Sequence, residues 1–409
     1  MILSSDPDLQ PPFLSWGFRP FFLMAGFYAV VVMAAWLSWL ITGRIVGSPD
    51  FSQLAIAPQA WHAHEMIFGY AAAVLSGFML TAVPNWTGAR RIAGGPLLLL
   101  AAVWFAGRLA MWFAAVLPPL MVATVDLIHL PLLAAFVAAG LFVRPAPRNI
   151  IFLGFISLLA LANLAFHAEA VQLVSKTATP ALMSALVLLS LMVAVIGGRI
   201  VPSFTRNVLI RHSTDPSRLP RSFPALDRVS LVSIALVVPL AAFGTTGWPI
   251  AVMAGIAAVS NAARLSFWRG ADTLGSPILW SLHVSYALLV AGFAALGVAS
   301  LVEWLPLSSA IHLVGIGGIG GMTLAVMTRA ALGHTGRPLR VSTPLALAYA
   351  MVAVAAVVRA CGPVLAPSHY EATLLVAGLL WISAFAIFAL RYAPILVGPS
   401  CKPAPGAQP

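Results

Sequence analysis

The sequence predicts an all-α fold, a polytopic bundle of about 12 transmembrane helices that forms a single transmembrane domain over residues 1–409. Three observations predict it. Hydrophobic residues make up 61% of the chain and charged residues only 8%, whereas a soluble domain carries about 25% charged residues. The apolar residues fall in runs long enough to cross a bilayer. The basic residues lie almost entirely on alternate loops between these runs.

The apolar runs define the expected helices, because a span needs about 20 apolar residues at the rise of an α-helix. Twelve runs meet this requirement, at about 20–41, 61–84, 96–117, 119–143, 149–172, 180–204, 228–244, 248–267, 276–300, 307–331, 343–366 and 371–392. The loops between them are short except for 205–227, which is polar and rich in proline. We interpret that segment as a cytoplasmic linker between two six-helix halves.

The distribution of Lys and Arg predicts the orientation. With the N-terminus in the cytoplasm, seventeen of the 22 basic residues lie inside and two, Arg44 and Lys176, lie outside. The other three, Arg108, Arg199 and Arg359, lie within spans. Cytoplasmic loops of membrane proteins carry such an excess of positive charge. We therefore expect a chain that crosses the membrane many times, with both termini in the cytoplasm.

A faint internal repeat accompanies these helices. The second, sixth and tenth runs end in TAVPNWTGAR, GRIVPSFTRN and TLAVMTRAAL, each at an inner boundary and each four helices after the last. This spacing is compatible with three units of four helices, as an alternative to two six-helix halves. A Thr/Arg-rich exit is also a common way to leave a membrane, so the sequence leaves both arrangements open.

The net charge of +11 does not indicate a nucleic-acid partner. Nucleic-acid-binding domains gather Lys and Arg on one face, whereas here the basic residues are spread through the loops between apolar runs. The partners that we expect instead are membrane lipid and a ligand held inside the bundle.

Histidines within the spans are the main candidates for chemistry, because ionisable groups inside a membrane are costly and usually functional. His62, His64 and Glu65 open the second run, His167 lies near the outer end of the fifth and His312 starts the tenth. His283 lies in the inner part of the ninth. A neutral imidazole binds Fe, Cu and Zn, and helices that place His at one depth can build a metal site. The alternative is a set of structural histidines near the interface, each hydrogen-bonded to a carbonyl.

The spacing of His62 and His64 adds a constraint. At 3.6 residues per turn, two residues two apart point in nearly opposite directions, so a regular helix cannot aim both at one metal ion. The two histidines therefore serve two centres, or the helix start is unwound. His62 and Glu65 share a face instead.

Buried arginines extend this prediction. Arg108 and Arg359 lie in the outer halves of the third and eleventh runs, and a buried cation needs an anion. Haem propionates are suitable bidentate partners for a guanidinium. Pairing with Glu65 or Glu169, or snorkelling to the interface, are the alternatives. The chain has no C-x-x-C-H motif for covalent haem attachment, so a bound haem would be a noncovalent haem b held by histidine.

Several segments together resemble one family, the NnrS membrane proteins of the bacterial nitric oxide response. They are GFRPFFL (17–23), WHAHEMIFGYAAAVLSGFMLTAVPNWTG (61–88), GRLAMW (107–112), NLAFH (163–167), GGRIVPSFTRN (197–207), LHVSYA (282–287) and TLAVMTRAALGHTGRPL (323–339). They cover nearly the whole chain in order, and the two longest are highly specific. The resemblance implies a twelve-helix bundle in the inner membrane of a bacterial cell, with bound haem and copper, that protects against nitrosative stress.

The resemblance and the residues together set the expected site. We expect a haem b and a copper ion held by residues from the set His62, His64, Glu65, Arg108, His167, His283, His312 and Arg359. The imidazoles and Glu65 are the candidate metal ligands, and the two arginines are candidate partners of the cofactor. His129 is left out of this set, because it looks like an addition of this chain.

The expected function is to bind or turn over nitric oxide, or a similar small gas, in nitrosative stress defence. If the protein is an enzyme, it is an oxidoreductase acting on nitric oxide, and it needs an electron donor. The alternatives are a secondary transporter, for which twelve helices in two halves is a common plan, and a haem or copper assembly factor. A transporter binds its substrate near the midplane, whereas the imidazoles here gather near one outer depth.

Overall fold

The computed structural model describes residues 10–44, 56–211 and 215–401, and it is helical throughout this part of the chain with no strand. Twelve helices are long and apolar enough to span a membrane, which confirms the predicted all-α, polytopic fold and the predicted number of spans. The chain is a multi-pass membrane protein. The fold follows from charge-poor, apolar segments, because in hydrocarbon only a helix satisfies all backbone hydrogen bonds within one such segment.

The chain divides into two compact units. Unit 1 comprises residues 1–182, 327–339 and 388–409, and unit 2 comprises residues 183–326 and 340–387. Each unit is described by itself below. The chain passes from one unit to the other between residues 182 and 183, 326 and 327, 339 and 340, and 387 and 388.

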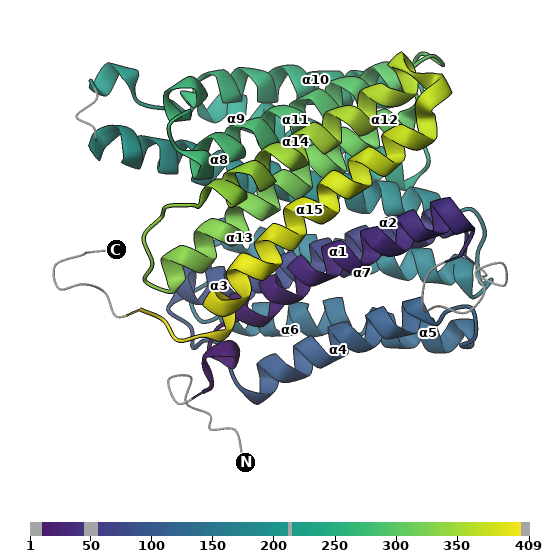
Figure 1. Ribbon diagram of the computed structural model, residues 1–409, viewed down its shortest axis with the longest axis horizontal. Helices are drawn as coiled ribbons and strands as arrows, with labels where there is room; N and C mark the ends of the chain where they lie inside the picture. The colour runs from purple at the N-terminus through teal and green to yellow at the C-terminus, as the bar shows by residue number, and fades with distance from the viewer. Residues whose placement is uncertain (1–9, 45–55, 212–214, 402–409) are drawn as a thin grey trace. The chain divides into compact units, whose positions relative to one another are not determined.

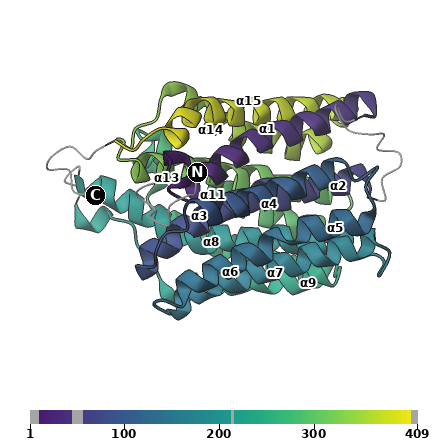
Figure 2. The ribbon, with the colours of Figure 1, turned by 90° about the horizontal axis from the view of Figure 1, so that it is seen from below.

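The helices of unit 1 build the first half of the chain. They are α1 (Phe18–Thr42), α2 (Pro58–His64), the π-helix η4 (Glu65–Ala71), α3 (Ala72–Thr87), α4 (Gly95–Trp112), α5 (Pro119–Leu127), α6 (His129–Leu141) and α7 (Pro147–Ala170), preceded by the 3₁₀ turn η2 (Pro12–Leu14). Helices α2, η4 and α3 run on as one span, and α5 and α6 form another. Helix α4 packs on α5, and α6 packs on α7 (Figure 1, Figure 2).

The helices of unit 2 follow in the same manner. They are α8 (Ala178–Arg211), α9 (Pro224–Ala242), α10 (Trp248–Ser266), α11 (Pro277–Ala299), α12 (Leu307–His312), the π-helix η7 (Leu313–Gly320), α13 (Gly321–His334), α14 (Thr343–Leu365) and α15 (Tyr370–Val397), with the 3₁₀ turns η5 (Pro216–Arg218), η6 (Gly270–Thr273) and η8 (Pro367–His369). Unit 1 also contains the start of α8 (178–182), the second half of α13 (327–334) and the last part of α15 (388–397). Helices α9, α10 and α11 pack in sequence (Figure 1).

Helix α8 continues further than the sequence indicates. Its apolar run ends near residue 204, but the helix passes through Pro202 and ends at Arg211. Transmembrane helices tolerate an internal proline, because neighbouring groups satisfy the freed backbone carbonyl. The first seven residues of the expected 205–227 linker are therefore helical.

Two local breaks place polar side chains in the core of unit 1. The helix that begins at Pro58 widens into a π-helix directly after His64, a deformation found frequently at functional sites. The second break separates α5 from α6. Pro131 has no N–H to donate to the carbonyl of Leu127, so the helix is interrupted just after Asp126.

Candidate metal centre

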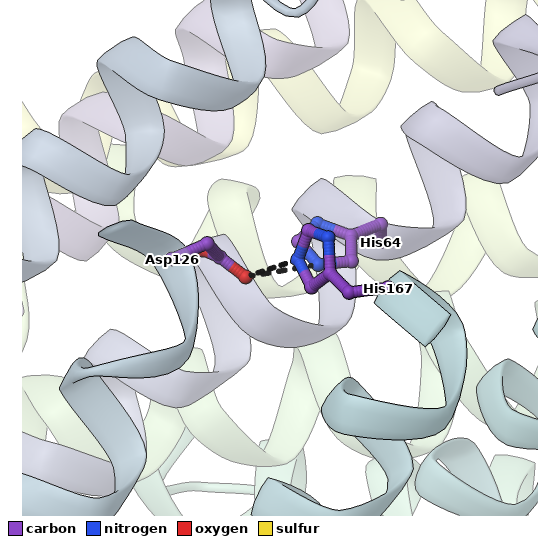
Figure 3. A group of neighbouring side chains, drawn as sticks. All are labelled: His64, Asp126 and His167. Carbon is purple, nitrogen blue, oxygen red and sulfur yellow. Dashed lines mark hydrogen bonds and ion pairs between the residues drawn. The ribbon is translucent and has the colours of Figure 1, made fainter. Parts of the chain in front are cut away.

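Three buried side chains from three helices of unit 1 come together in one cluster. His64 is the last residue of α2, Asp126 lies near the end of α5 and His167 lies near the end of α7. Their ligand atoms all lie within 4.8 Å of one another. Figure 3 shows the Asp126 carboxylate facing the two imidazole rings. Among the described residues, this is the one group of three or more His, Cys, Asp or Glu side chains with such geometry.

Asp126 is the centre of the cluster. Its Oδ2 lies 2.9 Å from His167 Nε2 and 3.3 Å from His64 Nε2. Asn163, one turn before His167 on α7, donates its amide N–H to the same oxygen at 2.8 Å. The other oxygen, Oδ1, accepts from Arg108 of α4. Asp126 is 2% exposed, so every one of these contacts is shielded from water.

Glu65 orients His64 from the opposite side. Its Oε1 lies 2.8 Å from His64 Nδ1 and accepts from Arg108 Nη1 at 2.5 Å, and its Oε2 accepts the hydroxyl proton of Tyr28 from α1. Because an ionised carboxylate can only accept, Nδ1 of His64 carries a proton and donates it to Glu65. This leaves Nε2 as the nitrogen that can bind a metal ion, the arrangement in which a carboxylate positions a histidine ligand.

The oxygen atoms around His64 Nε2 favour a positive charge at this position. Nε2 lies 2.9 Å from Asn163 Oδ1 as well as 3.3 Å from Asp126 Oδ2. In a neutral imidazole with the proton on Nδ1, Nε2 carries a lone pair, and here it faces two oxygen atoms. Only a proton on Nε2 or a cation between these atoms makes the contacts favourable.

The charges of the cluster lead to the same conclusion. Two buried carboxylates, Glu65 and Asp126, face one guanidinium, that of Arg108, with side chains 0%, 1% and 5% exposed. With neutral imidazoles the group therefore has a net charge of about −1, which is costly in a low-dielectric interior. One further positive charge, from a proton or a metal ion, neutralises it.

The packing of the cluster suits an ion rather than a macrocycle. The ring of His64 has Phe68 at 4.9 Å and Phe166 at 4.5 Å between ring centres. His64 is 0% exposed and His167 is 1% exposed. Two imidazoles and a carboxylate are ligands of Zn, Cu and non-haem Fe. The donor set therefore fits a small metal ion, whereas a haem would have to displace these aromatic rings.

The remaining candidate residues lie elsewhere. His62 stacks on Trp36 of α1, with ring centres 4.6 Å apart and planes 18° apart, so it does not join His64. This agrees with the opposite directions that regular helix imposes on the pair. Arg108 pairs with the carboxylates of Glu65 and Asp126, so its guanidinium is not available to a haem propionate. His129, which the sequence analysis left out, bonds to Ser76 and is not a member of the cluster.

Three candidate residues belong to unit 2. His283 Nε2 lies 3.0 Å from the hydroxyl of Thr205. His312 Nδ1 donates to the carbonyl of Ser308 at 2.6 Å, which leaves its Nε2 as the nitrogen available to a ligand. The guanidinium of Arg359 lies over the ring of Tyr370.

The sequence analysis missed Asp126, Asn163 and Tyr28. A signal for Asp126 was present, because an acidic residue within an apolar run is itself a functional candidate. Asn163 carried a signal as well, because a polar amide within an apolar run usually hydrogen-bonds to a neighbouring helix, whereas nothing in one sequence marks Tyr28.

The sequence of the chain also matches a known protein family. The model of one family, described as NnrS protein, matches residues 12–400, nearly the whole chain. The chain belongs to the NnrS family. Membership confirms the resemblance found in the sequence, and it supports a membrane protein of the nitric oxide response. No curated protein matches the chain.

Proposed function

We propose that this NnrS-family protein is a resident metal protein of the bacterial inner membrane that binds or turns over nitric oxide in nitrosative stress defence. The observation that carries the proposal is the buried His64–Asp126–His167 cluster, whose ligand atoms lie within 4.8 Å of one another. Family membership supports the role in the nitric oxide response. The cytoplasmic location of both termini rests on the charge bias of the loops.

Copper is the metal that we assign to the cluster. Imidazole nitrogen suits copper, and monovalent copper in place of the proton on His64 would leave the buried group neutral. Asp126 and the two imidazoles would hold the ion, Glu65 and Arg108 would fix their orientation, and the aromatic packing would exclude water. Copper bound here would supply one-electron chemistry and a binding position for a small gas. An electron donor is then a required partner.

Haem b, if bound, uses other residues of this chain. The candidates are His62, His283 and His312, which lie outside the cluster. Of these, His312 has the feature typical of a metal ligand, a ring whose Nδ1 is held by a backbone carbonyl, which fixes the tautomer and orients Nε2.

Complete burial favours a resident centre over the alternatives. An assembly factor has to release its metal, whereas His64 and His167 are at most 1% exposed. A transporter has to open its site to water on both sides of the membrane. We therefore expect the metal to stay with the protein through purification.

Metal analysis of purified variants tests the proposal. His64→Ala and His167→Ala should each lower the copper content measured by mass spectrometry, and both should weaken nitric oxide binding in an anaerobic titration. His369→Ala is the control, because that exposed residue lies in the turn η8. Unchanged copper content and nitric oxide binding in both cluster variants would refute the proposal.

A further inference from the structure

Arg359 is a buried cation of unit 2 that lacks a carboxylate partner. It is 8% exposed, and its Nη1 has no hydrogen-bond partner. Its guanidinium lies 5.8 Å from the centre of the Tyr370 ring, and it forms no ion pair with any described residue. The other buried arginines of the described chain are all compensated: Arg108 and Arg264 by carboxylates, and Arg19 by backbone carbonyls and a hydroxyl.

The surroundings of Arg359 repeat those of Arg108 in unit 1. In each unit a histidine ends a short helix, a π-helix begins at the next residue, and the following span carries the arginine. The histidine is His64 in α2 before η4, and His312 in α12 before η7. The arginines lie on α4 and α14 respectively.

The two carboxylates that pair with Arg108 in unit 1 have no counterparts at the matching positions of unit 2. In unit 1 the residue after the histidine is Glu65, whereas in unit 2 it is Leu313. In unit 1 the next span supplies Asp126, seven residues after the start of α5. In α15 the acidic residue of the first turn is Glu371, which is exposed and forms no ion pair with Arg359, and Ala377 stands seven residues after the helix start, at the position of Asp126. Unit 2 thus keeps the histidine and the arginine but lacks both anions.

The packing of unit 2 brings His312 and Arg359 to similar depths. A Cβ on Gly317 would lie 3.1 Å from the Cβ of Ala356, so η7 and α14 are in close contact at this point. From there, His312 lies five residues back along the chain and Arg359 three residues onward. Because consecutive spans run antiparallel, both displacements point to the same end of the two helices, by about 7.5 Å and about 4.5 Å at the α-helical rise of 1.5 Å per residue.

We propose that the guanidinium of Arg359 binds the oxygen atoms of an anion that unit 2 does not provide itself. A guanidinium presents parallel N–H groups that match a planar pair of oxygens, so the ligand is a small planar oxyanion or the carboxylate of a larger ligand. His312 donates from Nδ1 to the carbonyl of Ser308, so its Nε2 carries a lone pair, and the N–H groups that hold the oxygens come from the guanidinium of Arg359. This site is separate from the cluster of unit 1 and does not depend on the metal there.

The test measures anion binding by the full-length protein in detergent. Sodium nitrite and sodium formate are titrated calorimetrically at constant ionic strength, and haem and haem dimethyl ester are titrated spectroscopically. Arg359→Gln should weaken binding by about tenfold to a hundredfold, in one of two patterns. In the first, the variant binds nitrite and formate more weakly. In the second, it binds haem more weakly but binds haem dimethyl ester as the wild type does. The first result identifies a free oxyanion as the ligand, and the second identifies the carboxylates of a larger one.

A second variant supplies the missing carboxylate. Leu313→Glu recreates in unit 2 the residue that follows His64 in unit 1, so it should neutralise Arg359 and abolish anion binding. Leu313→Gln, similar in size but uncharged, should still bind, and Arg228→Gln, at an exposed arginine of unit 2, should behave as the wild type. Thermal unfolding of each variant confirms that it is folded.

Two results would overturn the proposal. One is a wild type that binds none of the four probes, which would mean that Arg359 is solvated at the membrane interface and binds no anion. The other is equal binding by the wild type, Arg359→Gln and Leu313→Glu. His64→Ala separates this outcome from failure of the metal centre, because that variant should lose metal and keep anion binding.

Discussion

Replacing Asp126 by asparagine tests the cluster of unit 1 at its centre. The carboxylate accepts from Arg108 through Oδ1, and its Oδ2 faces His167 Nε2 at 2.9 Å, His64 Nε2 at 3.3 Å and the amide of Asn163 at 2.8 Å. The substitution keeps the size of the side chain but removes its charge. It also places an amide N–H against groups that already donate.

The expected loss has two parts. Arg108 stays paired with Glu65 at 2.5 Å, so no buried charge is left alone, but buried donors of Asn163, His167 and Arg108 lose their acceptor, which costs about 1–3 kcal/mol. The metal loses one of three ligands, so its affinity should fall by more than the roughly 10–100-fold seen when a residue that only orients a ligand is removed.

The assay is thermal unfolding of the detergent-purified protein, together with metal content by mass spectrometry. Asp272→Asn is the matched control, because Asp272 pairs with Arg269 at 3.0 Å and with Arg218 at 3.6 Å, two arginines whose side chains are 36% and 60% exposed. It should cost little stability and leave the metal unchanged. An Asp126→Asn variant that retains full metal content and wild-type stability would refute the reasoning.

Three further predictions follow from the geometry. His62→Ala and His64→Ala should have separable effects, with loss of copper in the second alone, and identical metal losses in both would contradict two separate positions. Gly69→Ala should lower the free energy of unfolding by about 1–3 kcal/mol and lower the metal content, because a Cβ there would lie 2.6 Å from the ring of Tyr28, which bonds to Glu65. Gly255→Ala, with open space around it, is the control. Equal unfolding temperatures of the two variants would contradict the prediction. A reporter fused after Pro409 should be active in the cytoplasm, and activity only in the periplasm would overturn the proposed topology.

The fold could be predicted because the bilayer permits few alternatives. A chain with 8% charged residues cannot cover a water-exposed surface, and hydrocarbon requires a segment to satisfy its own backbone. The opposite directions of His62 and His64 were also predictable, since they depend only on the period of the helix. The extent of α8 was not, because a polar segment after Pro202 indicates a loop although the helix continues to Arg211.

The cluster itself could be predicted only in part. His64 and His167 stood out as imidazoles at similar depth, and Glu65 was a candidate partner for Arg108. The role of Asp126 depends on how α5 is rotated and on which helices it faces, and no single sequence contains that information. The same limit explains why His312 and Arg359 were grouped with the other candidates, although they lie in unit 2 and lack the carboxylates of unit 1.

X-ray absorption at the copper edge is the most direct test of the metal centre. It compares anaerobically purified wild type with the His64→Ala/His167→Ala double variant after both are loaded with copper. We predict two imidazole ligands and one oxygen ligand in the wild type, at metal–ligand distances of about 2.0–2.2 Å, and loss of the bound copper in the double variant. Copper retained in the double variant with an unchanged spectrum would contradict the assignment of the metal to this cluster.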